Sequence, residues 1–325
     1  SQDFQLQQLQ DKVSVTAGET LTLTCTTSGV GPNGPTKWLK SWGSRNETIY
    51  EQSPNPPPRV TRVEPESNTD FSIHIGNVHP EDAGTYYCIK FSKVLGRGDE
   101  VLRQGNGTEV SIRAKPTPPV MSGPKHRAGP GQSVSVTCTA GGFFPKDISV
   151  KWLKDKASIS AQQPQVIPGQ TKSSYNMSST ATVTLQKDDV RSQLVCEVLH
   201  STLTAPLRET YQLSKALRVS PTVQVVTDPR SPVEVNKIVN FTCHVKGFYP
   251  REVAITWLEN GTEMKVENIV RLVETHQGLF ELWSLVEVQA MEEKNGSMFT
   301  CRVVHDAQEP ISRMAALWIA APAQG

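Results

Sequence analysis

A Cys–Trp–Cys unit that occurs three times places the strongest constraint on the fold of this 325-residue chain. In each unit two cysteines stand roughly 60 residues apart, and one tryptophan follows the first cysteine at a similar distance. Six cysteines allow many connectivities in principle, but a repeated unit selects the one that pairs cysteines within each unit. The expected bridges are Cys25–Cys88, Cys138–Cys196 and Cys243–Cys301, and the three tryptophans are Trp38, Trp152 and Trp257.

The second and third units are so similar that they align by eye. CTAGGFFPKDISVKWLKD (138–155) matches CHVKGFYPREVAITWLEN (243–260) without gaps, and CEVLH (196–200) matches CRVVH (301–305). Apolar and polar residues alternate in SVSVTC (133–138) and ISVKWL (148–153), as they do in half-buried strands. Turn residues separate these runs, and none of the runs keeps a helical period. The sequence therefore predicts an all-β chain of three sandwiches, each with its tryptophan packed on the bridge.

Composition limits the classes of function. A net charge of +1 argues against broad attraction to nucleic acid or anionic lipid. The longest apolar run, near residues 314–321, is far shorter than the ~20 residues of a spanning helix. The chain begins at Ser1 without an apolar targeting segment, so we expect a processed or truncated soluble fragment.

Six N-x-[ST] sequons beside an even cysteine count favour a secreted or cell-surface glycoprotein. We expect glycans on Asn46, Asn176, Asn240, Asn260 and Asn295. The sixth sequon, at Asn106, lies in a Gly-x-Gly turn, where a glycan would crowd the next strand. We therefore expect low occupancy at Asn106.

The first unit differs from the other two. DAGTYYC (82–88) places Tyr86 two residues before a cysteine, at the tyrosine-corner position of immunoglobulin-like sandwiches. Arg59 stands where a strand begins in variable-type domains, so we expect an Arg59–Asp82 ion pair. The longer spacing between Trp38 and Cys88 predicts an additional C′ strand, and the glycines of GNGTEVSIRAKP (105–116) permit a bulge.

Over all 325 residues the chain resembles the signal-regulatory proteins, paired receptors of myeloid cells and lymphocytes. The resemblance rests on the motifs DFSIHIGNVHPEDAGTYYCIKF (70–91), GTEVSIRAKP (107–116), GFFPKDISVKWLK (142–154) and FYPREVAITWLENG (248–261). It implies one V-type domain followed by two C1-type domains, with expected bounds 1–115, 116–219 and 220–325. Proline-rich joints between the domains favour an extended rod.

The resemblance also implies a function. The best-known members of this family bind the immunoglobulin domain of integrin-associated protein on another cell and regulate immune-cell signalling and phagocytosis, whereas some members do not bind it. The contacts come from V-domain loops, which are 28–35, 51–58, 65–70 and 92–100 here. The residues expected to bind are Val30, Gln52, Asn68, Lys93, Leu95, Arg97 and Asp99. We expect the extracellular portion of a single-pass type I membrane protein, anchored by a segment outside this chain.

Two departures from the family pattern weaken the transfer of that ligand. The loop before DFSI is shorter than the family's usual loop, and the 51–58 loop contains four prolines. The tripeptide Arg97-Gly98-Asp99 leaves open an adhesion protein that binds integrins, with Asp99 as a ligand of the integrin's metal ion. A homophilic rod and cis dimers through the second or third domain also remain open.

Catalysis has little support in the sequence. None of the seven histidines stands at zinc-ligand spacing from another histidine or cysteine. There is no glycine-rich phosphate loop and no serine nucleophile elbow. We therefore expect no enzyme, metal, cofactor, small-molecule substrate or nucleic-acid partner. His200 and His305 are expected to have structural roles.

Overall fold

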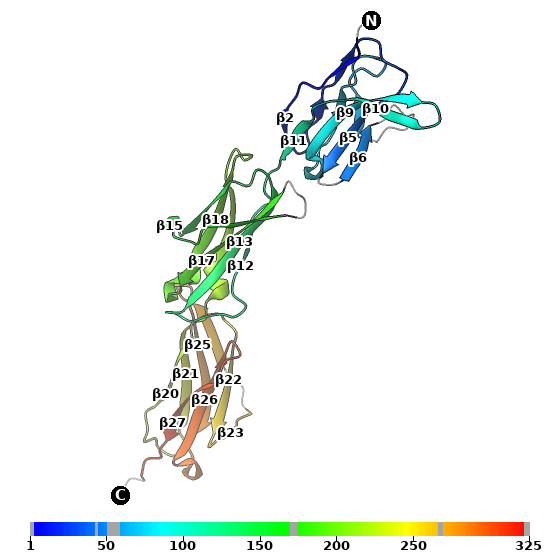
Figure 1. Cartoon of the computed structure of the whole chain (residues 1–325). Coiled ribbons are helices and arrows are strands. Elements are labelled where there is room, and N and C mark those ends of the chain that lie inside the picture. The colour runs from blue at the N-terminus through cyan, green and yellow to red at the C-terminus, as the bar shows by residue number, and fades with distance from the viewer. Residues whose placement is uncertain (1–2, 43–44, 51–58, 170–173, 266–268, 322–325) are drawn as a thin grey trace.

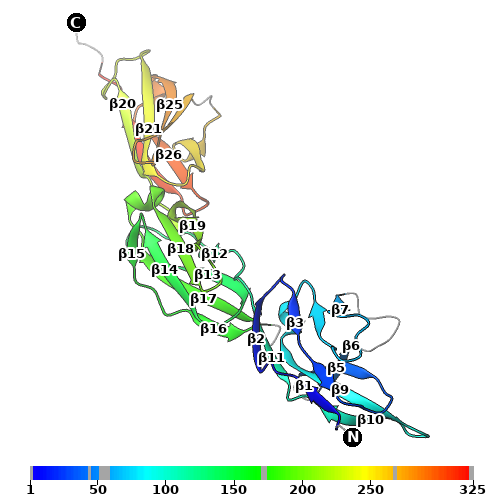
Figure 2. The same ribbon diagram turned by 90° about the horizontal axis from the view of Figure 1, so that it is seen from above.

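The computed structural model describes residues 3–42, 45–50, 59–169, 174–265 and 269–321, except for the side chains of residues 42, 45–47 and 50. Three β-sandwiches follow one another end to end, with the N-terminus and the C-terminus at opposite ends of the molecule (Figure 1). The molecule is elongated in the second view as well (Figure 2). Within the described residues, no helix is both long enough and apolar enough to span a membrane.

The first sandwich consists of strands β1 to β11. Its large sheet has the order β2-β11-β9-β5-β6, with β10 paired to β9 alone, and β2 runs parallel to β11. These strands are β2 (Lys12–Thr16), β11 (Thr108–Arg113), β9 (Gly84–Val94), β5 (Thr36–Trp42), β6 (Arg45–Tyr50) and β10 (Gly98–Gln104). The opposing sheet contains β3 (Leu21–Leu23), β8 (Ile73–Ile75) and β7 (Val60–Arg62), and β1 (Gln5–Gln7) pairs with β4 (Thr26–Ser28). Strand β6 is the predicted additional strand.

The second and third sandwiches share one topology, with two four-stranded sheets each. The second has β12 (Val120–Ser122), β13 (Ser133–Phe143), β17 (Tyr175–Thr184) and β16 (Gln165–Pro168) opposite β15 (Ala157–Ile159), β14 (Ile148–Lys154), β18 (Gln193–His200) and β19 (Leu207–Gln212). The third has β20 (Thr222–Asp228), β21 (Ile238–Phe248), β25 (Phe280–Gln289) and β24 (Ile269–Glu274) opposite β23 (Thr262–Glu263), β22 (Val253–Glu259), β26 (Ser297–His305) and β27 (Ile311–Leu317). Short 3-10 turns are η1 (Pro80–Asp82), η2 (Lys187–Arg191), η3 (Leu213–Ala216) and η4 (Glu292–Lys294). The all-β expectation is confirmed.

Each core is built on one bridge and one buried tryptophan. The bridges pair Cys25 with Cys88, Cys138 with Cys196 and Cys243 with Cys301, as the repeated unit predicts. Trp152 and Trp257 each donate their indole N–H to a buried serine hydroxyl, at 2.9 and 3.0 Å. Trp38 instead donates to the carbonyl of Phe71 at 2.8 Å. Burying an indole requires such an acceptor, because its N–H would otherwise lose the hydrogen bond to water.

The expected Arg59–Asp82 pair joins the residue before β7 to the last residue of η1. The guanidinium donates to both carboxylate oxygens, at 2.8 and 3.0 Å. Burial by itself would raise the pKa of Asp82, but the hydrogen bonds from Arg59 and from the His79 N–H outweigh it and lower that pKa. The Tyr86 hydroxyl donates to the Asp82 carbonyl oxygen and completes the tyrosine corner.

The joints between domains are formed by short backbone pairings. Ala114 pairs with Phe144 between the first and second sandwiches, and Val219 pairs with Tyr249 between the second and third. At the second joint Arg218 also donates its Nε–H to Asp306, with 2.7 Å between the atoms. These contacts hold the second and third domains close together. The expected domain bounds at 115/116 and 219/220 stay a prediction.

Candidate functional site

The 28–35 loop is held on both sides by neighbouring strands of the first domain. On one side β1 pairs with β4, and a Cβ added to Gly29 would overlap the Asp3 carbonyl oxygen. On the other side a Cβ added to Gly34 would overlap the carbonyl oxygen of Phe91 in β9. Glycine is needed at both positions because the backbones approach so closely. The loop is therefore fixed, while Val30 within it is 87% exposed.

Backbone hydrogen bonds connect this loop to the β9–β10 hairpin. The Lys93 N–H donates to the Asn33 carbonyl oxygen, and the Phe91 N–H donates to the Pro35 carbonyl oxygen, both at 2.9 Å. Lys90 donates from its ammonium group to the Gly34 carbonyl oxygen, and burial lowers the pKa of Lys90. The two predicted loops thus form one continuous surface.

The β9–β10 hairpin carries four of the predicted residues. Gly98 pairs with Val94 and Asp99 pairs with Lys93, so the turn consists of residues 95–97. Leu95 at this turn is 101% exposed. Gly96 and Gly98 have φ angles of +79° and +74°, which glycine adopts without strain. Figure 2 shows this hairpin at the end of the first domain that points away from the second domain.

Charges of both signs surround the turn. Arg97 in the turn lies 3.9 Å from Glu100, and both side chains are exposed. Lys93 and Asp99 face each other across the strands. Such exposed pairs contribute little to stability, so their charges remain available to a partner. With the apolar tips Val30 and Leu95, they form a surface of the kind that recognises proteins.

The 65–70 loop is held by Arg62, a residue that our sequence reasoning missed. The Arg62 guanidinium donates to the carbonyl oxygens of Pro65 at 3.1 Å, Ser67 at 2.6 Å and Asp70. Its Cζ lies 4.7 Å from the centre of the Phe71 ring. The sequence contains a sign of this role. Arg62 stands two residues after the buried Val60, so both side chains lie on the inward face of the strand.

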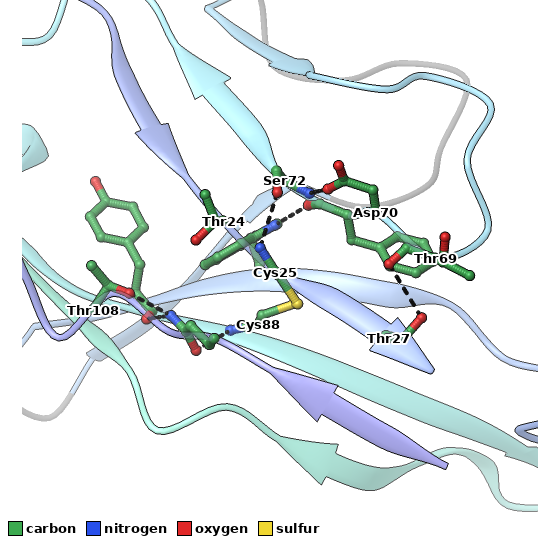
Figure 3. The surroundings of a disulfide bond; sticks show 12 residues. Thr24, Cys25, Thr27, Thr69, Asp70, Ser72, Cys88 and Thr108 are labelled. Carbon is green, nitrogen blue, oxygen red and sulfur yellow. Dashed lines mark hydrogen bonds between the residues drawn. A yellow bond between two sulfur atoms is a disulfide. The ribbon is translucent and has the colours of Figure 1, made fainter. Parts of the chain in front are cut away.

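The 65–70 loop also contacts the strand that precedes the 28–35 loop. The Thr27 N–H donates to the Thr69 carbonyl oxygen at 2.7 Å, and the Phe71 N–H donates to the Cys25 carbonyl oxygen at 2.8 Å. Figure 3 shows Thr69 and Asp70 beside Thr27 and the Cys25–Cys88 bridge. Asn68 is exposed on this loop.

The structure therefore joins three of the four predicted loops. Six of the seven predicted residues are exposed or partly so on these loops, namely Val30, Asn68, Lys93, Leu95, Arg97 and Asp99. The seventh, Gln52, lies with the 51–58 loop outside the described residues. Among the described residues, no group of three or more His, Cys, Asp or Glu side chains could hold a metal ion.

The sequons differ in their surroundings. Asn106, Asn176, Asn260 and Asn295 are exposed, whereas Asn240 is half-buried and its Oδ1 is buried without a hydrogen-bond partner. Asn240 is less exposed than we expected because β21 lies between β20 and β25. The side chain of Asn46 lies outside the described part of the chain. Glycan occupancy at every sequon stays a prediction.

Comparison with known families agrees with this architecture. An immunoglobulin V-set domain matches residues 8–113, and immunoglobulin C1-set domains match residues 120–203 and 223–308. The fold and the order of its domains thus define a V–C1–C1 protein of the immunoglobulin superfamily.

Similar proteins narrow the class to a family. Tyrosine-protein phosphatase non-receptor type substrate 1 of Bos taurus is 44% identical over 325 residues, covering 98% of this chain and 63% of the relative. Signal-regulatory protein beta-1 of Homo sapiens is 43% identical over 324 residues, covering 98% of this chain and 80% of the relative. The chain belongs to the signal-regulatory protein family. It spans 63% of the length of the bovine relative.

Proposed function

We propose that this chain is the extracellular part of a single-pass type I cell-surface receptor. Its V-type domain binds the immunoglobulin domain of integrin-associated protein on an opposing cell. The receptor thereby regulates immune-cell signalling and phagocytosis. The second and third domains act as a spacer that holds the V-type domain away from the membrane. Membership of the signal-regulatory protein family supports this proposal.

One observation carries the proposal: apolar side chains are strongly exposed on two loops that are joined by backbone hydrogen bonds. Val30 and Leu95 expose 87% and 101% of their surface, yet the loops beneath them are hydrogen-bonded to each other. A rigid loop loses little conformational entropy on binding, so burial of such side chains adds directly to affinity. Interfaces concentrate their binding energy in a few residues of this kind.

The test is a binding measurement with the immunoglobulin domain of integrin-associated protein from the same species. The 325-residue chain would be attached through its C-terminal end. We expect Leu95→Ser and Val30→Ser each to weaken binding at least about tenfold, equal to about 1.4 kcal/mol. Leu199→Ser, at a 40% exposed position of the second domain, serves as the matched control and should change nothing. Absence of binding by the wild-type chain would contradict the ligand, and full affinity of the second and third domains alone would contradict the site.

Integrin binding is a second candidate, favoured by the exposure of Arg97 and Asp99 at the end of the hairpin. In the hairpin only Arg97 lies within the turn, whereas Asp99 is paired with Lys93 across the strands. An integrin would need the Asp99 carboxylate to reach its metal ion from this strand position. We therefore rank this candidate second.

A further inference from the structure

A groove of about 390 Å³ lies on the outer face of the β12-β13-β17-β16 sheet of the second domain. This volume falls within the range of roughly 300–1,000 Å³ that is usual for small-molecule sites. Two exposed aliphatic side chains line it: Val120 is 64% exposed and Ile167 is 58% exposed. Other side chains along the groove include Thr117, Thr139, Gln165 and Ser178.

The rest of this face is polar, so the two aliphatic side chains are not part of a general apolar surface. Serine and threonine hydroxyls pair across β13 and β17 in three successive rows: Ser133 with Thr184, Ser135 with Thr182 and Thr137 with Thr180. Their oxygen atoms lie 3.0, 3.3 and 3.1 Å apart. Covering the two aliphatic side chains would remove their apolar surface from water, which is favourable.

Asn176 forms one wall of the groove and belongs to the sequon Asn176-Met177-Ser178. It stands directly opposite Ile167 in the pairing of β16 with β17. Met177 is 2% exposed and packs in the core, so its two neighbours face outward. The glycan-accepting asparagine and an exposed aliphatic side chain are therefore adjacent on the same face.

A bulge in β13 fixes the orientation of the Asn176 side chain. The Gly142 N–H donates to Asn176 Oδ1 at 3.2 Å, and a Cβ added to Gly141 would overlap that same oxygen. The pairing of β13 with β17 shifts register at these two glycines. Because Oδ1 is engaged with β13, Nδ2 is the atom left for a covalent attachment, and a glycan on Nδ2 preserves the bond to Gly142.

We propose that Asn176 carries an N-linked glycan whose first N-acetylglucosamine residues lie in this groove against Val120 and Ile167. Attachment joins Nδ2 to the anomeric carbon of an oligosaccharide carried on a lipid diphosphate. An N–C bond forms, the C–O bond to the diphosphate breaks, and the diphosphate leaves with the bonding electrons while the amide gives up one proton to solvent. The C–H face of the sugar then covers the aliphatic side chains, and its hydroxyl groups face Thr139 and Gln165.

The test compares glycans within one molecule produced in mammalian cells. Glycopeptide mass spectrometry measures occupancy, and peptide-N-glycosidase F measures the rate of release under native conditions. We expect Asn176 to be occupied. We also expect its glycan to be released at least about tenfold more slowly than the glycan on exposed Asn260, a ratio of rates that corresponds to about 1.4 kcal/mol. An unoccupied Asn176, or equal release rates, would overturn the proposal.

Variants test the groove itself. Ile167→Ser should accelerate release at Asn176 and leave release at Asn260 unchanged, whereas the matched control Val226→Ser should alter neither. Val226 is a 47% exposed residue of the third domain. Should Ile167→Ser unfold the domain, Ser178→Ala removes the glycan and keeps both aliphatic side chains. That variant should bind more of an apolar fluorescent dye than the wild type does. Equal dye binding would contradict the proposal that the glycan lies in the groove.

Discussion

Lys154 and Asp189 form an ion pair in the second domain, with Nζ and Oδ1 2.9 Å apart. The equivalent positions of the third domain, Glu259 and Lys294, form the same contact at 3.1 Å with the charges exchanged. The pair in the second domain connects the end of β14 to the 3-10 turn η2, and the pair in the third domain connects the end of β22 to η4. The attraction is the same in both domains although the positive and negative partners change places, because the contact requires opposite charges but not a particular one at either position.

The two pairs differ in burial, so removing one partner should lower the free energy of unfolding by different amounts. Asp189 is 3% exposed and also accepts hydrogen bonds from the Gln186 N–H and the Ser192 hydroxyl, whereas both partners in the third domain are about 30% exposed. Lys154→Met should cost about 2–3 kcal/mol, because it leaves a buried carboxylate without its cation. Glu259→Gln should cost less than about 1 kcal/mol. Hydrogen exchange of β14 and β22 amides in the full chain measures both, and equal costs would contradict the argument.

Arg62 should control the shape of the 65–70 loop. Arg62→Met keeps an unbranched apolar stem but removes three hydrogen bonds to loop carbonyl oxygens. The loop amides should therefore exchange at least about tenfold faster, equal to about 1.4 kcal/mol. Arg62→Lys should restore only part of this protection, because a compact ammonium group cannot reproduce the guanidinium fork. Arg302→Met, at an exposed position of the third domain, is the matched control. Unchanged exchange in Arg62→Met would show that the loop holds its shape without the arginine.

The third domain should lose stability in mild acid through His305. Burial, the largest effect, lowers the pKa of His305 below its ordinary 6.5, although the hydrogen bond to the Pro250 carbonyl and the nearby Asp306 and Glu252 act in the opposite direction. Arg218 adds to the lowering. The unfolded chain then binds more protons than the folded one, so this contribution is present above about pH 6.5 and is lost as pH falls through the folded pKa.

A variant isolates that contribution. His305→Gln removes the titrating group, so the free energy of unfolding should depend less on pH between about 7 and 5 than in the wild type. The absolute stability will also change, because the imidazole ring packs edge-on against Phe248, with 5.3 Å between centroids. The quantity to compare is therefore the slope of the free energy of unfolding against pH. An unchanged slope in His305→Gln would refute the assignment.

The Arg-Gly-Asp tripeptide should act without a metal ion. Binding to integrin-associated protein should survive EDTA, because exposed Arg97 and Asp99 act there as charges at the rim of the contact. Asp99→Glu keeps the charge and should change that affinity less than about threefold, within the usual effect of an exposed pair of charges. Integrin-dependent adhesion of cells to the wild-type domain, abolished both by EDTA and by Asp99→Glu, would establish the second candidate instead.

Some contacts could be predicted from the sequence because few residue types can make them. The bridges, the buried tryptophans and the Arg59–Asp82 pair each depend on a side chain that recurs at a fixed place in the strand order. The family resemblance places Val30 and Leu95 on V-domain loops, and both side chains are strongly exposed there. Contact of these residues with a partner stays a prediction.

Other contacts depend on distances that spacing does not reveal. Arg62 reaches three carbonyl oxygens because the 65–70 loop curls over its guanidinium. The half-burial of Asn240 arises from two neighbouring strands that come from different parts of the chain. The groove at Asn176 likewise needs β16 beside β17, and the pairing register alone brings Ile167 opposite the asparagine.

The pairing of β1 with β4 has a practical consequence for reagents made from this protein. Because β1 lies beside the 28–35 loop, anything fused to the N-terminal side of the chain would crowd the candidate binding surface. A fluorescent protein, an affinity tag or a display anchor placed there would compete with the partner for space. The C-terminus lies at the opposite end of the molecule (Figure 1), so coupling through that end leaves the loops open to solvent.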